Sequence, residues 1–132
     1  MLDHVRGVLP EEGCGFLAGK SLIAEVALPV TNRLHSTVRF EMEPQEQLKA
    51  MLWMEENGLD IAAIYHSHPE GPAVPSPTDL AEHAYPDAIC LILSSTRADD
   101  QWQIRAFRIM DQRFEELSIT NRVNIDRPGG QQ

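Results

Sequence analysis

The chain has 132 residues, of which 42% are hydrophobic and 23% are charged, and these proportions predict one ordinary globular domain and exclude wholesale disorder. Eleven Lys and Arg against twenty Asp and Glu leave a formal net charge of −9, which argues against nucleic-acid and anionic-membrane partners because both select basic surfaces. The sequence shows no apolar run of the ~18 residues that span a membrane, no signal peptide and too few cysteines for a disulfide framework, so we expect a reduced, cytoplasmic protein.

Hydrophobic spacing and turn residues predict five elements in the first half of the chain. They are a short helix over residues 1–9, strands over residues 15–20 and 22–30, a weaker strand over residues 37–41 and a helix over residues 44–57. Pro10 ends the first helix, and Gly58 lies where a C-cap glycine is expected. The turn between the first two strands is expected at Gly19-Lys20-Ser21.

The sequence of the second half predicts four further strands and a helix, with a rigid loop before the helix. Buried strands are expected over residues 60–65 and 88–94, a short helix over residues 77–84, and a hairpin of strands over residues 103–109 and 114–119. Four of the nine prolines lie between Pro69 and Pro77, which predicts a stiff, irregular loop. The mixture of strands and helices predicts an α/β (α+β) domain with one sheet over residues 1–120, followed by a flexible tail over residues 121–132.

The strongest chemical signal is His66-Ser67-His68-Pro69, at the end of the strand predicted over residues 60–65. Histidines at i and i+2 of an extended segment project from the same face, because strand side chains alternate with a period of two. Both imidazoles can therefore bind one metal ion, and Asp79, which follows the proline-rich loop, offers a carboxylate as a third ligand. Two histidines and one carboxylate leave a position open for water, as in a catalytic zinc site, whereas structural zinc takes four protein ligands.

The same residues also have a purely structural interpretation. A His-x-His pair alone is weak evidence for a metal. Ser76-Pro77-Thr78-Asp79 has the pattern of a helix N-terminus, with Ser as the N-cap, Pro at the first helical position and an acid at the third. The two interpretations are compatible, because a carboxylate has two oxygens and a hydroxyl both accepts and donates. The two histidines, the serine and the aspartate lie within fourteen residues of each other, and this favours the metal.

Two blocks of the sequence resemble those of a known protein family. His66-Ser67-His68-Pro69, followed after seven residues by the pattern Ser76-x-x-Asp79, resembles the motif of the JAMM (MPN-plus, JAB-type) zinc metalloproteases. The segment Glu12-Gly13-Cys14-Gly15 resembles the family's upstream block, in which a Glu stands two residues before a Cys-Gly pair. The resemblance runs from about His4 to Ile119 and is to the prokaryotic branch of the family.

This resemblance implies a role for each residue of the two blocks. It implies one Zn²⁺ per chain, with water as its fourth ligand and with three protein ligands, His66, His68 and Asp79. Glu12 would be the general base that takes the proton of the water and later passes it to the leaving amine. Ser76 would donate a hydrogen bond to the oxyanion of the tetrahedral intermediate. Glu11 is the competing acid, and the Glu-x-Cys-Gly spacing selects Glu12.

The resemblance also implies a fold and a substrate class. The family fold is similar to that of the cytidine deaminases, a mixed, curved sheet flanked by helices. Members of the prokaryotic branch are peptidases or isopeptidases that cleave after the C-terminal Gly-Gly of small ubiquitin-like sulfur-carrier proteins. The alternative is a non-catalytic MPN-type scaffold for protein interactions, which the complete ligand set disfavours. Deamination is disfavoured too, because the deaminases of the related fold bind zinc through a Cys-x-x-Cys pair that this sequence lacks.

Overall fold

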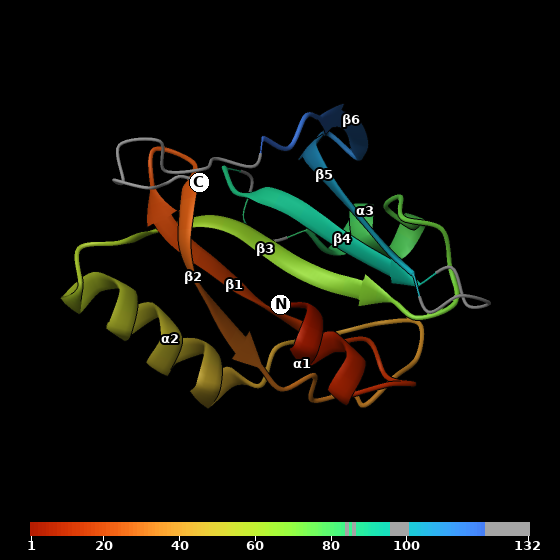
Figure 1. Ribbon diagram of the computed structural model, residues 1–132, viewed down its shortest axis with the longest axis horizontal. Helices are drawn as coiled ribbons and strands as arrows, with labels where there is room; N and C mark the ends of the chain where they lie inside the picture. Colours follow the sequence, from red (N-terminus) through yellow and green to blue (C-terminus); the bar gives the residue numbers. More distant parts are fainter. Residues whose placement is uncertain (84, 86, 96–100, 121–132) are drawn as a thin grey trace, which may run out of the picture.

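The computed structural model describes residues 1–83, 85, 87–95 and 101–120, and these residues form one mixed sheet with three helices (Figure 1). The elements in chain order are α1 (Leu2–Gly7), β1 (Cys14–Lys20), β2 (Ile23–Val30), α2 (Pro44–Glu56), β3 (Asp60–His68), α3 (Pro77–Glu82), β4 (Ile89–Ser95), β5 (Trp102–Met110) and β6 (Arg113–Leu117). The expected α/β (α+β) class with one central sheet is confirmed. Residues 121–132, expected as a tail, lie outside the described residues.

The six strands are hydrogen-bonded in the order β2-β1-β3-β4-β5-β6. Only β3 and β4 pair in parallel, and α3 lies on the crossover between them; the other four pairs are antiparallel. β2 and β6 are the two edges, so the sheet is open and mixed. The parallel pair needs a long connection, and this connection carries the proline-rich loop and α3 to the carboxyl end of β3.

Strand alternation divides the core between the two faces of the sheet. Val5 of α1 packs on one face, against a cluster that includes Tyr65 and Leu93. Met54 of α2 and Leu80 of α3 pack on the opposite face, in two separate clusters. His66 and His68 lie on the same face of β3 as the buried Ile64, because alternate residues of a strand share a face. Ile64 packs in the same cluster as Met54 of α2. The face covered by α2 and α3 is therefore the one that carries the histidines.

Local sequence explains most of the element boundaries. Two-residue hairpin turns favour positive φ at both central positions, and Ser21 and Leu22 (φ 52° and 63°) and Asp111 and Gln112 (φ 53° and 59°) adopt it. The first turn therefore lies one residue later than expected, while the second is centred where expected. Gly58, with φ 67°, follows the C-cap of α2 as a C-cap glycine does.

Three expectations about elements need correction. The strand expected over residues 37–41 is wrong: these residues lie in a loop, and the nearby ladder is a single bridge between Asn32 and Met42. The Asn32 amide binds two main-chain groups of this loop, the Arg39 carbonyl and the Glu41 N–H, in place of a strand partner. β3 continues to His68 and is three residues longer than expected, whereas α3 ends at Glu82. Within the described residues no helix is long and apolar enough to span a membrane.

Candidate metal centre

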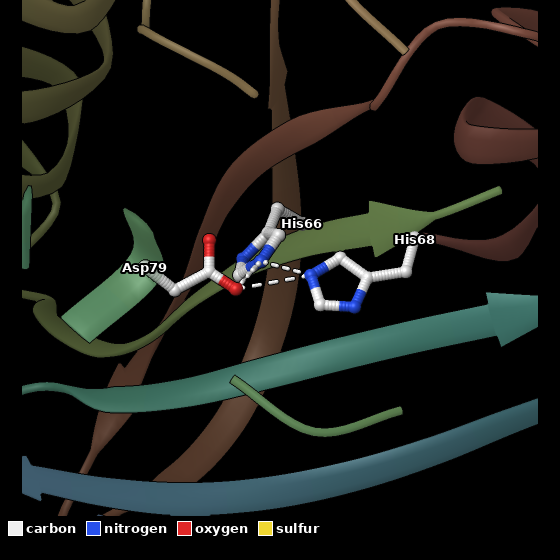
Figure 2. A group of neighbouring side chains, drawn as sticks. All are labelled: His66, His68 and Asp79. Atoms are coloured by element: carbon white, nitrogen blue, oxygen red, sulfur yellow. Dashed lines mark hydrogen bonds and ion pairs between the residues drawn. The ribbon is translucent and has the colours of Figure 1, made fainter. Parts of the chain in front are cut away.

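His66, His68 and Asp79 converge on one point at the carboxyl end of β3 (Figure 2). The two Nε2 atoms lie 3.1 Å apart, and Asp79 Oδ2 lies 3.2 Å from His66 Nε2 and 3.0 Å from His68 Nε2. The histidines come from alternate positions of β3, and Asp79 comes from the first turn of α3. The strand period and the helix start thus bring Asp79 to His68, which lies eleven positions earlier, and to His66, which lies thirteen positions earlier.

Further contacts fix the orientation of each of the three side chains. His68 Nδ1 lies 2.8 Å from the carbonyl oxygen of Pro72, and in the neutral imidazole a hydrogen bond donated there would leave the Nε2 lone pair free for a metal ion. The His66 ring stacks on Phe40 with 4.6 Å between ring centroids. Asp79 Oδ2 accepts from the main-chain N–H of Ser76 at 2.9 Å, and Ser76 Oγ accepts from the Asp79 N–H at 3.1 Å. This capping box confirms the structural interpretation of the Ser76–Asp79 segment, and the same Asp79 oxygen faces both histidines.

The protonation of the three groups reflects this crowding. Burial raises the pKa of Asp79, but hydrogen bonds from His66 and His68 outweigh burial and hold the pKa well below its ordinary value. Burial lowers the pKa of His66. For His68, burial also lowers the pKa, but the hydrogen bonds to Asp79 and Pro72 prevail and raise it. An ionised carboxylate is thus held against two buried imidazoles.

These three atoms fit a zinc ion. Zinc in a tetrahedral site binds nitrogen and oxygen at about 2.0–2.2 Å, which places neighbouring ligand atoms about 3.3 Å apart. The three distances here are 3.0–3.2 Å. Two neutral imidazoles and one carboxylate are ligands that zinc prefers, and the contact between His68 Nδ1 and a main-chain carbonyl is the usual support for a metal-binding histidine. The donor set leaves room for a further, non-protein ligand.

Glu12 reaches the same face through the register of β1 and β3. Cys14 pairs with His66 in that register, so continuing it places Glu12 opposite His68. Two hydrogen bonds between Gly13 and Ser67 extend the pairing: the Gly13 N–H donates to Ser67 Oγ at 2.8 Å, and the Ser67 N–H donates to the Gly13 carbonyl at 3.0 Å. Glu12 therefore lies beside the three-residue cluster although the sequence separates it by more than fifty positions.

The Glu12 side chain is buried and has an unused oxygen. The residue is only 3% exposed, and its Oε1 has no hydrogen-bond partner among the described residues. Burial raises the pKa of Glu12 to about 8; His68 opposes the rise and Asp79 adds to it. Glu11, by contrast, points to the surface and contacts His35 at 3.1 Å. The structure thus distinguishes the two adjacent acids, and only Glu12 faces the cluster.

Two cavities meet the cluster from different sides. One, of about 540 Å³, is lined by Glu12, His68 and Ser76 together with Val38 and several prolines of the loop. The other, of about 230 Å³, is lined by His66 and Asp79 and by a mixture of apolar and charged side chains, among them Phe40, Arg39 and Glu82. Glu12 and Ser76 line the larger cavity and not the smaller one, so the larger cavity is the space that brings these two candidate residues to His68. Ser76 Oγ accepts from Asp79 and keeps its own proton available for donation.

The comparisons with known proteins bear on what this arrangement is. The family model described as "Prokaryotic homologs of the JAB domain" matches residues 1–109. The chain belongs to the prokaryotic JAB family. The resemblance inferred from the two sequence blocks is therefore confirmed, and the matched range contains every residue of the cluster.

Individual relatives of this JAB chain cover most of its length. A CysO-cysteine peptidase of Mycobacterium tuberculosis is 38% identical over 113 residues, covering 84% of this chain and 77% of the relative. A desampylase of Haloferax volcanii is 35% identical over 126 residues, covering 90% and 87%. The solution structure of a Desulfitobacterium hafniense protein superposes with a TM-score of 0.81 at 34% identity, covering 91% of this chain and 84% of that one. The relatives named by activity are hydrolases, which confirms the expectation that the JAB chain is an enzyme.

Several residues that support the site are not evident from the sequence motifs. Ser67 stands between the two histidines, yet its hydrogen bond to Gly13 depends on strand pairing. Phe40 stacks on His66 from a loop that the sequence assigns to a strand. Asn32 donates to the Glu12 carbonyl at 3.1 Å, and its only sequence signal is a polar turn residue after a strand. Both cysteines are buried, and burial raises the pKa of each to about 12, which fits core roles.

Proposed function

We propose that this chain is a zinc-dependent peptidase or isopeptidase that cleaves after the C-terminal Gly-Gly of a small ubiquitin-like sulfur-carrier protein. The observation that carries the proposal is the buried Glu12 carboxyl, one oxygen of which has no hydrogen-bond partner among the described residues, in the wall of the same cavity as His68 and Ser76. A buried acid without a partner costs stability, and that cost is explained if the acid serves the reaction.

Each residue has a distinct part in this chemistry. His66, His68 and Asp79 would hold the zinc ion, which supplies Lewis-acid polarisation of a carbonyl and acidifies water at neutral pH. Glu12 takes a proton from the attacking water and delivers it to the leaving amine. In the metal-free protein burial raises the pKa of Glu12 to about 8, and the positive charge of a bound zinc ion would oppose that rise. A pKa near the working pH lets the group both accept and donate a proton. The Ser76 hydroxyl donates to the oxyanion that develops on the scissile carbonyl, a contribution worth about 3–4 kcal/mol at comparable sites.

The substrate class rests on the relatives and on the family resemblance. One relative is named a CysO-cysteine peptidase and another is named a desampylase. Both names describe enzymes that cleave a bond. The cavity that contains Glu12 is walled by four prolines of the 69–77 loop and by Pro10. Walls of this kind are rigid, and an extended glycine tail, which has no side chains to accommodate, suits them.

The test measures metal content and turnover on matched variants. Zinc per chain is measured on protein purified without chelator, for the wild type and for His68→Ala. Cleavage is then measured on a ubiquitin-like carrier whose Gly-Gly end is joined to a reporter amine. We expect about one zinc in the wild type and none in His68→Ala. Glu12→Gln should keep the zinc and lose about 10²–10⁴-fold in kcat.

Glu11→Gln is the matched control, because it removes the neighbouring acid that points to the surface. It should retain both the zinc and the turnover. A wild-type protein that binds no zinc when zinc is offered would contradict the catalytic proposal and favour the scaffold. Full activity in Glu12→Gln with unchanged zinc would refute the assignment of the base.

A further inference from the structure

Asn32 is a buried hydrogen-bond hub between the end of β2 and the loop that follows it. Its side chain is 4% exposed. Nδ2 donates to the carbonyl oxygens of Glu12 at 3.1 Å and Arg39 at 3.0 Å, with Ser36 O at 3.5 Å. Oδ1 accepts from the N–H groups of Leu34 at 3.1 Å and Glu41 at 3.2 Å. Both ends of the amide are thus fully used, and only Asn among residues of this size offers two donors and an acceptor in that arrangement.

Asn32 and the loop that it binds form hydrogen bonds with the main chain of Glu12. The Glu12 carbonyl accepts from Asn32, and the Glu12 N–H donates to Ser36 O at 2.8 Å. Ser36 is itself in the loop that Asn32 closes. On the other side, Gly13 is tied to Ser67 of β3 by two hydrogen bonds. The four main-chain polar groups of Glu12 and Gly13 are therefore all bound, two by the Asn32 loop and two by the strand that carries the histidines.

The same loop forms walls of both cavities. Thr37 and Val38 line the cavity that contains Glu12, and the following residues from Arg39 to Met42 line the cavity beside His66. Because Asn32 binds the carbonyl of Arg39 and the N–H of Glu41, it sets the path of the chain at the point where the loop passes from one cavity to the other.

From these contacts we propose that Asn32 is a positioning residue for the general base: it fixes the main chain of Glu12, and thereby the place of the Glu12 carboxyl relative to the metal ligands. The inference rests on the proposed function. Among the described residues one oxygen of the Glu12 carboxyl has no hydrogen-bond partner, so hydrogen bonds of the carboxyl do not fully determine its place. Its position depends on the main chain instead, and a misplacement of about 1 Å at a catalytic group costs about 10²-fold in rate.

The test compares two isosteric Asn→Asp substitutions. Asn32→Asp keeps the acceptor for Leu34 and Glu41 and replaces the donor with an oxygen that faces the Glu12 and Arg39 carbonyls. Asn57→Asp is the control: its Nδ2 donates to the Trp53 carbonyl at 2.8 Å at the exposed end of α2, away from the site. Asn32→Ser, which removes the amide without adding charge, is the second variant in case the charge prevents folding.

Amide hydrogen exchange reports on position independently of turnover. We expect the Glu12 N–H, which donates to Ser36, to exchange at least tenfold faster in Asn32→Asp, while the N–H of Phe16 in β1 is unchanged. Zinc content should stay at the wild-type value. Equal acceleration at Phe16 would indicate general destabilisation and would overturn the proposal, as would unchanged exchange at Glu12.

A double-mutant cycle on kcat then tests whether Asn32 acts through Glu12. Asn32→Asp should lower kcat about 10²-fold in the wild type and by less than threefold in the Glu12→Gln background. Asn57→Asp should leave kcat unchanged in both. A full loss in both backgrounds would show that Asn32 acts by another route and would refute the proposal. If the wild type binds zinc but cleaves no carrier, the proposed function fails, and the exchange experiment still decides whether Asn32 fixes the Glu12 segment.

Discussion

Replacing the buried acid with its amide should stabilise the metal-free protein at neutral and higher pH. Burial raises the pKa of Glu12 from an ordinary value of 4.5 to about 8. Between these values the folded state holds a proton that the unfolded state has released, so the free energy of unfolding falls as pH rises through this window. The contribution of Glu12 is fully present below about pH 4.5 and is lost above about pH 8. Because one pKa unit is worth about 1.4 kcal/mol, the loss amounts to a few kcal/mol.

Glu12→Gln removes this dependence because the amide does not titrate. We measure the free energy of unfolding by urea titration of chelator-treated protein. Relative to the wild type, the free energy of unfolding of Glu12→Gln should increase from pH 5 to pH 8, and the difference should stay constant above pH 8. His66, His68 and Asp79 are present in both proteins, so their contributions to the pH dependence of the free energy of unfolding cancel to first order in the difference. Glu25→Gln, on the exposed surface of β2, is the control and should run parallel to the wild type. A flat difference between Glu12→Gln and wild type would refute the burial argument, since it would mean that the carboxyl ionises in the folded state as it does in water.

Three further outcomes follow from the same contacts. Ser67→Ala leaves the Gly13 N–H without its partner, so we expect a loss of about 1–3 kcal/mol in the free energy of unfolding by urea titration; an unchanged midpoint would contradict the role of this bond. Ser76→Ala and Glu43→Ala each remove a helix N-cap, and each should lower the free energy of unfolding by about 1 kcal/mol. Only Ser76→Ala should also lower kcat, by about 10²-fold. Equal kcat values for the two variants would contradict the oxyanion role of Ser76. Added zinc should raise the Tm of the wild type and leave that of His68→Ala unchanged; a shift in both would place the zinc elsewhere.

The convergence of His66, His68 and Asp79, the candidate metal ligands, could be predicted from the sequence because their geometry is local. His66 and His68 share a strand face by alternation, and Ser76 and Asp79 share a helix start by the capping pattern. Only the proline-rich loop separates the two pairs. Periodicity and capping act over a few residues, so these relations do not depend on how the rest of the chain folds.

The position of Glu12 could not be predicted from local pattern, because it depends on strand pairing. The choice between Glu11 and Glu12 came from the family resemblance, and the structure separates them by burial and by the register of β1 with β3. The strand expected over residues 37–41 was wrong because the conformation of this loop also depends on contacts with a residue several positions away in the sequence. Its side chains alternate as in a strand, but the Asn32 amide binds the Arg39 carbonyl and the Glu41 N–H, and no local sequence pattern predicts such a contact.

The four residues of the centre are held in place by different means, and the difference follows from their chemistry. In the proposed zinc site each ligand would present a lone pair in a fixed direction, and His68 is oriented through its own ring by the Pro72 carbonyl and Asp79 by the Ser76 N–H. A group that accepts and returns a proton must keep an oxygen unbound, so orientation through its own carboxyl would compromise it. Glu12, the proposed base, has an oxygen without a hydrogen-bond partner among the described residues, and its main chain is bound on both sides. Fixing the main chain rather than the side chain keeps the carboxyl both in place and free to react.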